Sequence, residues 1–402
     1  MSEVTTSRGD AVKNLNIAMV AACPFPANRG TPSRIKGMAQ ALSQRGHRVA
    51  VVTYHFGLDL PVEGIELHRT PSLPYRYFAP GPTFTKLGVL DPLLLFKLVR
   101  LLKQEPFDLI HAHHFEGALI AYAARRITGV PAIYDAHTTL ASELATYSFP
   151  SSDRVSRYLD KNVPHWADQV VTVSETLRDI IRETGVEADK IDVIPTGADL
   201  GDFDGSDANL IRDRFDIGNR QIVMYSGSLD SFQQVELLID AMSSVARQES
   251  DAVLFLVVAR DRPEIRARCV EAEIQDRVIV AVEEDFRLVP SYLAAADVLV
   301  IPRTVCAGIP QKLVNYMLSE RAIVSFAGSA KLLQHEVNGL VVENGNTEAM
   351  ATAIVRLIRD PSLRRQLGEH ARETVVGHYD WQSLAVDLEQ TYGKVLVNSS
   401  RQ

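Results

Sequence analysis

The stretch GIPQKLVNYM (Gly308–Met317) follows the apolar run ADVLVIPR (Ala296–Arg303), and together they predict a strand, a glycine-containing turn and a helix. Pro310 suits the first position of that helix, because its missing N–H is not needed there. The free amides of the first turn and the helix dipole favour a bound phosphate. Lys312 adds a positive charge, and Asn315, one turn further on, suits a hydroxyl-bearing ligand such as ribose. The alternative for this stretch taken alone is an ordinary strand-to-helix turn.

The composition describes a folded protein of two domains. The chain has 402 residues, which fits two domains of roughly 200 residues each, and 46% of the residues are hydrophobic and 23% charged. A formal net charge of −8 argues against a general nucleic-acid binder. The three cysteines show no CxxC or CxxH spacing, which indicates a reducing compartment and no structural zinc.

The first residues are polar and lack the apolar core of a signal peptide. No apolar run reaches the length of about 18 residues that a membrane-spanning helix needs. We therefore expect a cytoplasmic protein with a disordered polar tail at residues 1–14.

Short apolar runs alternate with amphipathic, helix-like segments along the chain, which predicts doubly wound parallel sheets. In the first half the expected strands are Asn16–Ala22, Arg48–Tyr54, Phe107–His113, Pro131–His137 and Gln169–Ser174. A second alternating series follows a polar stretch, and functional residues are expected just after strands in both series. We expect Rossmann-like domains at 15–200 and 221–378, a linker at 201–220, and a C-terminal helix at 379–402 that crosses back to the first domain.

Motifs along nearly the whole chain resemble the GT-B glycosyltransferases of the large retaining family 4, and their joint order and spacing make the resemblance specific. They are PFPANRGTPSRIKGMAQALSQRGHRVAVVT, DLIHAHHFEG, PAIYDAHTTL, VTVSETLRDIIRETGVEADKIDVIPTGAD, AADVLVIPR with GIPQKLVNYML, GLVVENGNTEAMATAIVRLIRDP and YDWQSLAVDLEQTY. The resemblance implies an α/β GT-B fold, with two Rossmann-like doubly wound domains facing a cleft. It also implies a nucleotide diphosphate sugar as co-substrate, an acceptor on the N-terminal domain and no cofactor.

Four positions depart from the usual pattern of that family. Ala307 and Asn315 stand where the family carries two glutamates, and Ser228 and Gln233 stand where it carries an arginine and a lysine. Negative charge builds on the departing diphosphate during transfer, so donors must face it. The remaining candidates beside the turn at Pro310 are Lys312, Arg303 and the amides of Gly308 and Ile309, and we assign the main role to Lys312.

Histidines stand at the ends of two expected strands. The resemblance places His113 close to the reacting sugar and its leaving phosphate, where an imidazole can donate a hydrogen bond and has a pKa near neutrality. His111, His114 and His137 are expected substrate contacts, with packed or solvated side chains as the alternative. Glu116 is interpreted as part of the first turn of the next helix.

An N-terminal turn, NRGTPSRIKG, offers a second helix start. Thr31, which follows Gly30, is expected as the N-cap, with Pro32 at the first helical position and amides facing the acceptor or the donor phosphates. A plain helix start is the alternative. The chain has no GxGxxG and no GxxxxGK[ST], which argues against a dinucleotide dehydrogenase or an NTPase. No Asp-x-Asp or His/Asp/Glu cluster with metal-ligand spacing is visible, so we predict no metal requirement.

The segment 74–103 is aromatic, basic and then strongly apolar. Asp91 and Pro92 are expected to start a helix in which Lys97, Arg100 and Lys103 lie beside a Leu/Phe/Val face. One interpretation is peripheral contact with an anionic membrane, where a lipid-linked acceptor would be found. The other, which we favour, is a buried crossover helix with one solvated stripe.

The resemblance and the residues together predict a metal-independent, retaining hexosyltransferase of cell-envelope or polysaccharide biosynthesis. Its acceptor would be a glycan or a lipid-linked glycan. Two alternatives stay open, a non-catalytic sugar-nucleotide-binding or scaffold protein on a degenerate GT-B fold, and a sugar-nucleotide epimerase.

Overall fold

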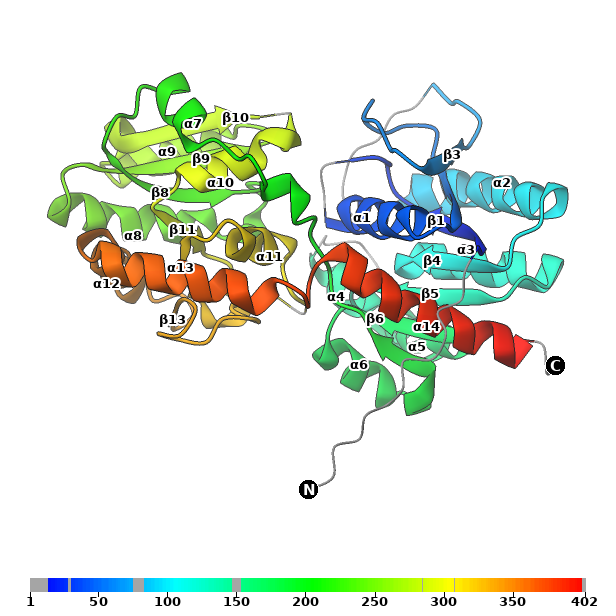
Figure 1. The fold of residues 1–402 in the computed structure, drawn as a ribbon. Coiled ribbons are helices and arrows are strands. Elements are labelled where there is room, and N and C mark those ends of the chain that lie inside the picture. Colours follow the sequence, from blue (N-terminus) through cyan, green and yellow to red (C-terminus); the bar gives the residue numbers. More distant parts are fainter. Residues whose placement is uncertain are drawn as a thin grey trace. The chain divides into compact units, whose positions relative to one another are not determined.

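The chain divides into two compact units, Met1–Gly197 with Trp381–Gln402 (unit 1) and Ala198–Asp380 (unit 2). The computed structural model describes residues 14–27, 30–74, 83–146, 153–283, 285–306 and 308–399. Each unit is built on one parallel sheet with helices on both faces (Figure 1).

The sheet of unit 1 has seven strands in the order β3-β2-β1-β4-β5-β6-β7, all paired in parallel. They are β1 (Asn16–Ala21), β2 (Arg48–Thr53), β3 (Ile65–Arg69), β4 (Leu109–His113), β5 (Ala132–Ala136), β6 (Gln169–Thr172) and β7 (Ile191–Val193). The five expected strands are confirmed, with ends within two residues. The two edge strands were not expected, because β3 has only two apolar residues, Ile65 and Leu67, and β7 has only three residues in all.

Helices cover both faces of this sheet. One face packs against α1 (Gly30–Gln44) and α14 (Trp381–Ser399), and the other against α2 (Asp91–Gln104), α3 (His114–Thr128), α4 (Leu140–Thr146), α5 (Asp153–Trp166) and α6 (Glu175–Arg182). A short π-helical turn, Lys86–Leu90, leads directly into α2.

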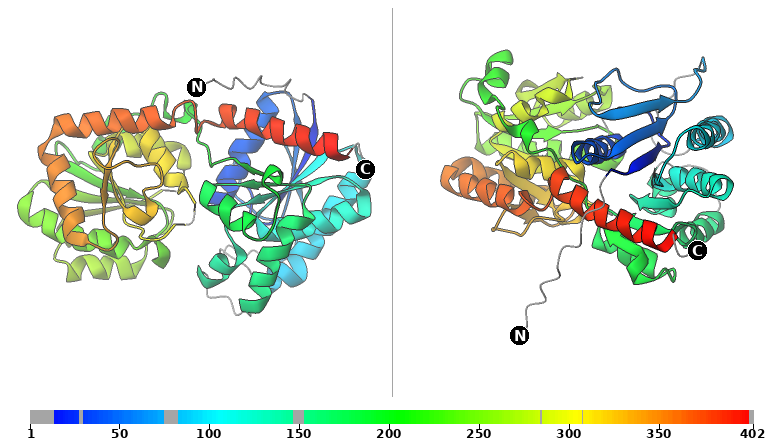
Figure 2. Two further views of the ribbon diagram at one scale, coloured as in Figure 1. Left: turned by 90° about the horizontal axis from the view of Figure 1, so that it is seen from below. Right: turned by 45° about the vertical axis from the view of Figure 1, so that its right-hand side comes forward.

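The last helix returns to unit 1 and packs beside α1 (Figure 2). Trp381 lies against Gly37, where a Cβ atom would come within 2.0 Å of the indole Nε1. Leu384 and Leu388 continue the contact into the core beside β1. Only glycine at position 37 allows this close approach, which fixes the expected C-terminal helix on the first domain.

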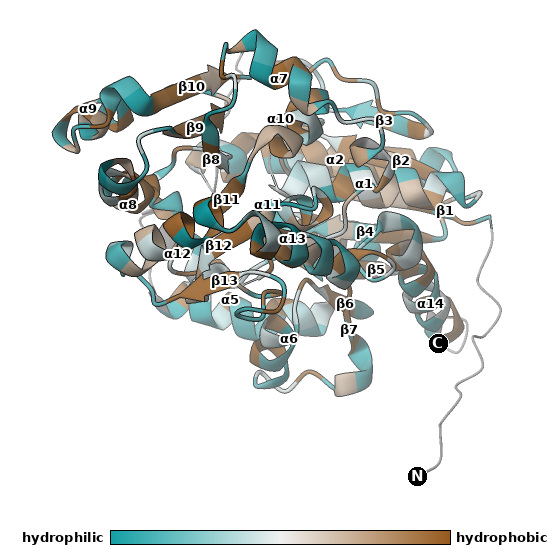
Figure 3. Cartoon of the chain, turned by 60° about the vertical axis from the view of Figure 1, so that its left-hand side comes forward, coloured by the Kyte–Doolittle hydropathy of each residue, from teal (hydrophilic) through white to brown (hydrophobic). Residues whose placement is uncertain are grey.

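The sheet of unit 2 has six parallel strands in the order β10-β9-β8-β11-β12-β13. They are β8 (Gln221–Ser226), β9 (Ala252–Val258), β10 (Val278–Val282), β11 (Val298–Ile301), β12 (Ala322–Phe326) and β13 (Leu340–Val342). The central strands are apolar along most of their length, as their brown colour in Figure 3 shows, and β9 and β11 are buried along their whole length.

Two helical layers cover this second sheet. One contains α8 (Val235–Gln248), α9 (Pro263–Glu271) and α12 (Thr347–Arg359), and the other contains α7 (Ala208–Arg214), α10 (Val289–Ala295), α11 (Gln311–Leu318) and α13 (Pro361–Val375). Short 3-10 turns lie in unit 1 at Ala188–Lys190 and in unit 2 at Gly201–Phe203, Ser231–Gln233, Gln275–Arg277, Phe286–Leu288 and Ala327–Ser329. The stretch 201–220, expected as a linker, instead contains α7, whose Ile211 is buried in the core of unit 2.

The helix expected within 74–103 begins at Asp91, with Pro92 in its first turn. Leu94, Leu98 and Leu101 are buried against the sheet, so α2 is the crossover between β3 and β4. Residues 75–82 of this segment lie outside the described part. None of the described helices is long and apolar enough to cross a bilayer.

Candidate functional site

In each sheet the strand order reverses beside the first strand of the domain, between β1 and β4 in unit 1 and between β8 and β11 in unit 2. Open parallel sheets bind ligands at the carboxyl ends of their strands, at such a reversal. His113 is the last residue of β4, and Arg303 follows β11 after one proline. Each predicted site therefore lies at the edge of its own sheet where a ligand is expected.

The histidines of β4 share one face of the sheet of unit 1. His111 and His113 are two residues apart, and strand side chains alternate, so both point toward α1 and α14. The strand register pairs His113 with Asp135 of β5, which places a carboxylate on the same face. Arg34 reaches this carboxylate from α1, and Tyr392 of α14 lies 2.8 Å from Nδ1 of His111.

The buried Asp135 carboxylate is the centre of this cluster. Arg34 donates to it twice, from Nε to Oδ2 at 2.9 Å and from Nη2 to Oδ1 at 3.1 Å. Nδ1 of His113 lies 3.0 Å from Oδ2, Nε2 of His137 lies at 3.4 Å and Nε2 of His111 at 3.6 Å. A bidentate pair of this kind fixes the orientation of the carboxylate and hence of the rings around it.

The charges of the cluster follow from burial and from Arg34. Burial opposes ionisation of Asp135, but Arg34 and the surrounding histidines together outweigh it and hold the pKa of that carboxyl well below its usual range. Burial lowers the pKa of His113 to about 3 and that of His137 to about 4. Both histidines are therefore neutral near pH 7, and the expected pKa near neutrality for His113 is wrong.

The same geometry sets which nitrogen of His113 carries the hydrogen. An ionised carboxylate 3.0 Å from Nδ1 favours hydrogen on that atom, which leaves Nε2 as a hydrogen-bond acceptor. The side chain is buried, and among the described residues neither ring nitrogen has a partner in hydrogen-bond geometry, although Nδ1 lies 3.0 Å from the carboxylate. His113 thus presents an acceptor, not the donor that the sequence suggested.

The helix after the N-terminal turn begins two residues earlier than expected. Helix α1 begins at Gly30, so Thr31 lies inside the first turn and is not the N-cap. Its Oγ1 lies 3.2 Å from Nδ1 of His137, which brings Thr31 to the edge of the Asp135 cluster.

His114 belongs to a second, separate group at the start of α3. Its Nδ1 lies 3.2 Å from Oε2 of Glu143 and 3.5 Å from Oε2 of Glu116, and Lys86 donates to Glu116 at 2.8 Å. Burial opposes protonation of His114, but Glu143 and then Glu116 outweigh it and raise its pKa to about 9. His114 is therefore a cation within an ion-pair cluster, an arrangement that the sequence did not predict.

Folding brings together two groups of possible metal ligands that the sequence spacing did not reveal. One group is His111, His113 and Asp135, and the other is His114, Glu116 and Glu143. Within each group the ligand atoms lie within 4.8 Å of one another. Each group already contains a cationic side chain, Arg34 in the first and Lys86 in the second. A divalent cation would have to compete with that charge, so neither donor set fits a metal well.

In unit 2 the predicted Lys312 lies at the reversal between β8 and β11. Its Nζ donates to the hydroxyl of Tyr225 at 2.8 Å and to Oε1 of Gln233 at 3.0 Å, and lies 4.0 Å from the centre of the Tyr225 ring. Gly227, directly after β8, makes room for it, because a Cβ atom there would lie 2.5 Å from Nζ. Gln233 therefore contacts the predicted phosphate-binding cation.

Within the described part of the chain Lys312 has no carboxylate within ion-pair distance. Burial, and then the positive charge of Arg303, lower its pKa to about 7. A half-buried cation without a counter-charge is stabilised by an anion. The predicted role of this residue in holding a diphosphate remains a prediction.

Two loops frame the site of unit 2. Gln234 accepts hydrogen bonds from the amide and the hydroxyl of Thr304, at 2.7 and 2.6 Å, which ties the loop after β8 to the loop after β11. The Arg303 guanidinium lies 5.1 Å from the centre of the Phe232 ring. Ser228 contributes its carbonyl, which accepts a 2.6 Å hydrogen bond from Tyr225.

The helix after Gly308 and Ile309 starts one residue later than expected. Pro310 is the N-cap and α11 begins at Gln311, so Pro310 is not the first helical residue. Asn315 accepts a 3.4 Å hydrogen bond from the side chain of Gln311, one turn before it. Ala307 lies outside the described residues.

Sequence reasoning missed the residues that orient these groups, which are Arg34, Asp135, Tyr392, Tyr225 and Gln234. Asp135 could have been predicted as a site residue, because it stands two residues before His137 at the end of an expected strand. The others lie far from their partners in sequence and could not have been predicted in this way.

Two Rossmann-like domains, each with a candidate site where the strand order reverses, and a C-terminal helix returned to the first domain define the GT-B class. Two family models match the chain, Glycosyltransferase Family 4 over residues 29–202 and Glycosyl transferases group 1 over residues 220–360. The chain therefore belongs to the family 4 glycosyltransferases.

Individual proteins agree with this placement. The α-D-kanosaminyltransferase of Streptomyces kanamyceticus is 25% identical over 92% of this chain and 96% of its own. The sucrose-phosphate synthase of Thermosynechococcus elongatus superposes with a TM-score of 0.80 at 21% identity, covering 96% of this chain and all of that one. Anabaena HepE in complex with UDP and glucose gives 0.75 at 20% identity, over 94% and 100%. These structures confirm the GT-B fold.

Proposed function

We propose that this protein is a retaining glycosyltransferase that moves a hexose from a nucleoside diphosphate sugar to a glycan or lipid-linked glycan. The donor binds to unit 2, and unit 1 holds the acceptor. The observation that carries the proposal is the ammonium group of Lys312, which lies at the strand reversal of unit 2 without a carboxylate partner among the described residues. The name of the kanosaminyltransferase and the UDP and glucose bound to HepE support this class of donor.

In its protonated form Lys312 meets the diphosphate with a positive charge in a partly desolvated place, where such a charge stabilises a departing phosphate most. Arg303 and the amides of Gly308 and Ile309 add donors, and Asn315 contacts the ribose. Ser228 and Gln233 replace the usual charged pair, and Gln233 orients Lys312. These side chains supply the charge that the leaving group needs, so the reaction proceeds without a metal ion.

His113 acts in this proposal by accepting a hydrogen bond at Nε2 from a hydroxyl of the sugar or the acceptor. A group whose pKa is about 3 takes up a proton poorly near pH 7, so His113 positions the hydroxyl and does not remove its proton. Arg34 and Asp135 hold the ring in that orientation. Thr31, His111 and His137 support the same cluster.

Calorimetric titration with UDP, GDP and ADP tests the donor site. The Lys312→Ala variant should bind the preferred diphosphate at least about tenfold more weakly, because a charge-assisted hydrogen bond to phosphate is lost. Lys331→Ala, an exposed lysine of unit 2, is the matched control and should bind normally. Equal affinities for the two variants would refute the assignment of Lys312.

Steady-state transfer tests His113. His113→Ala should lower turnover about a hundredfold, a typical scale for one hydrogen-bonding group that assists the transition state, with affinity for the nucleoside diphosphate unchanged. His165→Ala, an exposed histidine of unit 1, is the control. An unaltered rate in His113→Ala removes this residue from the mechanism.

A non-catalytic sugar-nucleotide-binding or scaffold protein is the second candidate, and the neutral side chains of Ser228, Gln233 and Asn315 favour it. Such a protein would bind a sugar nucleotide without turning it over at any acceptor. A sugar-nucleotide epimerase would instead convert the donor in the absence of acceptor. Product analysis with and without acceptor separates the three functions.

The segment before α3 offers a surface for a lipid-linked acceptor. Phe84, Leu87, Val89 and Phe96 are exposed by 71, 43, 45 and 62%, and α2 also carries Lys97, Arg100 and Lys103. Exposed apolar side chains next to basic ones suit an anionic membrane surface. We propose peripheral contact at the inner face of the membrane through this segment.

Sedimentation with vesicles tests the membrane contact. Phe84→Ser/Leu87→Ser should reduce binding to phosphatidylglycerol vesicles, whereas Val155→Ser, which changes an exposed valine of α5, should not. No binding of the wild-type protein to anionic vesicles would contradict the contact and leave the donor site unaffected.

A further inference from the structure

Unit 2 contains a cavity of about 590 Å³ at the amino ends of β11 and β12. It is bounded by the end of α10, by the turn from α11 into β12 and by one side of α13 between Pro361 and Arg372. Lys312 and Arg303 belong to the opposite, carboxyl edge of the same sheet. The cavity is therefore separate from the candidate donor site.

Charged side chains dominate the wall of this cavity. Four arginines line it, together with three carboxylates, and they are Arg321, Arg364, Arg365, Arg372, Asp297, Glu320 and Glu369. The whole chain carries a net charge of −8, so a wall with more guanidinium groups than carboxylates is unusual for this protein.

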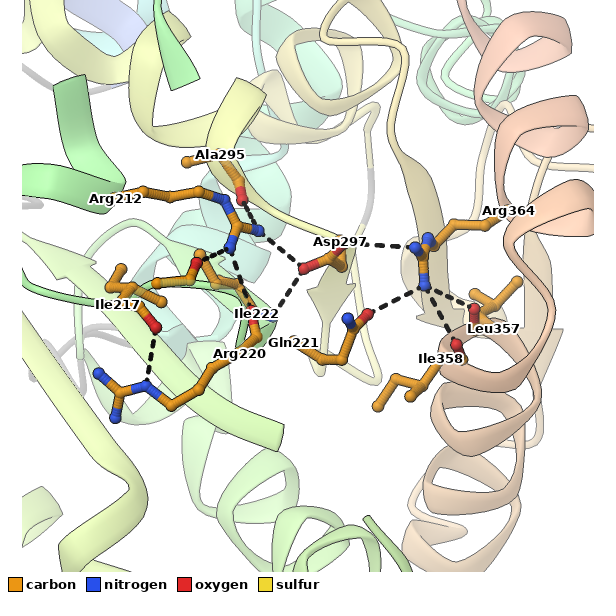
Figure 4. Close-up of polar contacts among 11 residues, drawn as sticks. Arg212, Ile217, Arg220, Gln221, Ile222, Ala295, Asp297, Leu357, Ile358 and Arg364 are labelled. Carbon is orange, nitrogen blue, oxygen red and sulfur yellow. Dashed lines mark hydrogen bonds and ion pairs between the residues drawn. The ribbon is translucent and has the colours of Figure 1, made fainter. Parts of the chain in front are cut away.

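Asp297, in the floor of the cavity, already forms ion pairs with two arginines. Figure 4 shows it between two arginines, with Nη2 of Arg212 3.0 Å from Oδ2 and Nη2 of Arg364 3.4 Å from Oδ1. Arg364 also donates to the carbonyls of Leu357 and Ile358 at the end of α12. Asp297 thus offers little negative charge to the cavity, and Arg364 is held in place by its own partners.

Arg372 has a comparable structural role on the other side. Its Nη1 donates to the carbonyl of Leu318 at 2.6 Å, at the end of α11, and its Nε lies 3.8 Å from Glu320. A cation at this position compensates the negative end of the helix dipole. Of the three carboxylates, only Glu369, which is exposed, remains without an ion pair among the described residues.

The other two arginines of the wall, Arg321 and Arg365, have no such structural partners among the described residues. Among the described residues neither Arg321 nor Arg365 forms an ion pair or a side-chain hydrogen bond, and Nε of Arg321 is buried without a partner. Burial lowers the pKa of Arg321, the carboxylates of Asp297 and Glu320 oppose this shift in part, and the neighbouring Arg212 and Arg364 add to it. A desolvated guanidinium of this kind is costly unless an anion pairs with it.

We propose that this cavity is a second ligand site, which binds a phosphorylated small molecule through Arg321 and Arg365. Guanidinium groups match phosphate with paired, planar hydrogen bonds, and the volume exceeds that of inorganic phosphate alone. The ligand is an anionic effector, distinct from the sugar nucleotide bound at Lys312.

Calorimetric titration of the full chain with fructose 1,6-bisphosphate tests the site. The probe has two phosphates and no nucleoside, so it distinguishes this cavity from the donor site. Saturable binding should weaken roughly tenfold or more in Arg321→Gln/Arg365→Gln, because two charged donors are lost. Arg287→Gln, which removes a fully exposed arginine of unit 2 outside the cavity, and Lys312→Ala should both bind as the wild type does.

Because Arg321 is partly buried, thermal melts must show that the double variant is folded, and the single variant Arg365→Gln, at an exposed position, serves if it is not. Absence of saturable binding to the wild type at millimolar probe overturns the proposal. Equal affinity of the wild type and the arginine variants also overturns it, as does loss of binding in Lys312→Ala. None of these results bears on sugar transfer, so failure here leaves the proposed function standing.

Discussion

His113 and Asp135 face each other across neighbouring strands, with Nδ1 of the imidazole 3.0 Å from Oδ2 of the carboxylate. Arg34 helps to keep that carboxylate ionised, burial keeps the His113 ring neutral, and the carboxylate favours hydrogen on Nδ1 of that ring. The orientation of His113, at the end of β4, therefore depends on the ion pair that Arg34 of α1 forms with Asp135. This relationship also makes the stability of unit 1 depend on pH.

Acid should destabilise the protein through its neutral histidines. His113 and His137 have folded pKa values of about 3 and 4, below the ordinary value of about 6.5. Between those values the unfolded chain binds protons that the folded chain does not, so the free energy of unfolding falls as pH falls from 6.5 to 4. Each histidine contributes at most about 1.4 kcal/mol per pH unit.

Urea denaturation at a series of pH values measures this slope. The variant His113→Gln/His137→Gln should show a flatter dependence than the wild type between pH 6.5 and 4. His165→Gln, at an exposed position, should leave the slope unchanged. Parallel curves for the wild type and the double variant would show that these histidines are not neutral in the folded state.

Affinity for a nucleoside diphosphate should fall as pH rises above 7. The pKa of Lys312 in the free protein is about 7, so its ammonium group loses its proton in this range, and an anion can bind it only after a proton returns. The loss is at most tenfold per pH unit. At pH 8, binding heats should therefore depend on the ionisation enthalpy of the buffer. Lys312→Arg, which stays charged, should bind with equal affinity from pH 7 to 9. A wild-type affinity that does not change over that range would contradict the assignment.

Gly227→Ala should displace the side chain of Lys312 while leaving the lysine itself unchanged. Position 227 has φ +149°, and an added Cβ would lie 2.5 Å from Nζ, so the ammonium group must move. We expect diphosphate affinity to fall roughly tenfold, a loss of about 1.4 kcal/mol. The control is Gly218→Ala, because Gly218 has φ +61° and no atom within 4 Å of the added Cβ. That variant should lose about 1–2 kcal/mol of stability and keep its affinity.

Gly37→Ala should loosen the contact between α1 and α14. The added Cβ would come within 2.0 Å of Trp381, and overpacking of this kind costs about 1–3 kcal/mol. Gly30→Ala changes the same helix where no atom lies within 4 Å, and should leave stability unchanged or slightly higher. Denaturant midpoints measure both variants, and equal midpoints would mean that the helices separate without cost.

Some features of the site were predictable because they depend on neighbours in sequence. The strand before His113 and the turn before Lys312 are local patterns, and the position of a site at the ends of parallel strands follows from the alternation of strands and helices. The start of α11 was misplaced by one residue, and Thr31 was misassigned as a cap. Helix ends depend on single backbone angles, which hydrophobic periodicity does not report.

The sequence by itself determined the two α/β domains, their GT-B family and the positions of His113 and Lys312. Only the tertiary structure decided the chemical state of those side chains. Asp135 lies 22 positions from His113, Arg34 lies 101 positions from Asp135, and Tyr225 lies 87 positions from Lys312. Burial among such partners sets whether an imidazole or an ammonium group is charged. Charge state follows the local dielectric and the nearest counter-charge, and both exist only once distant segments have packed together.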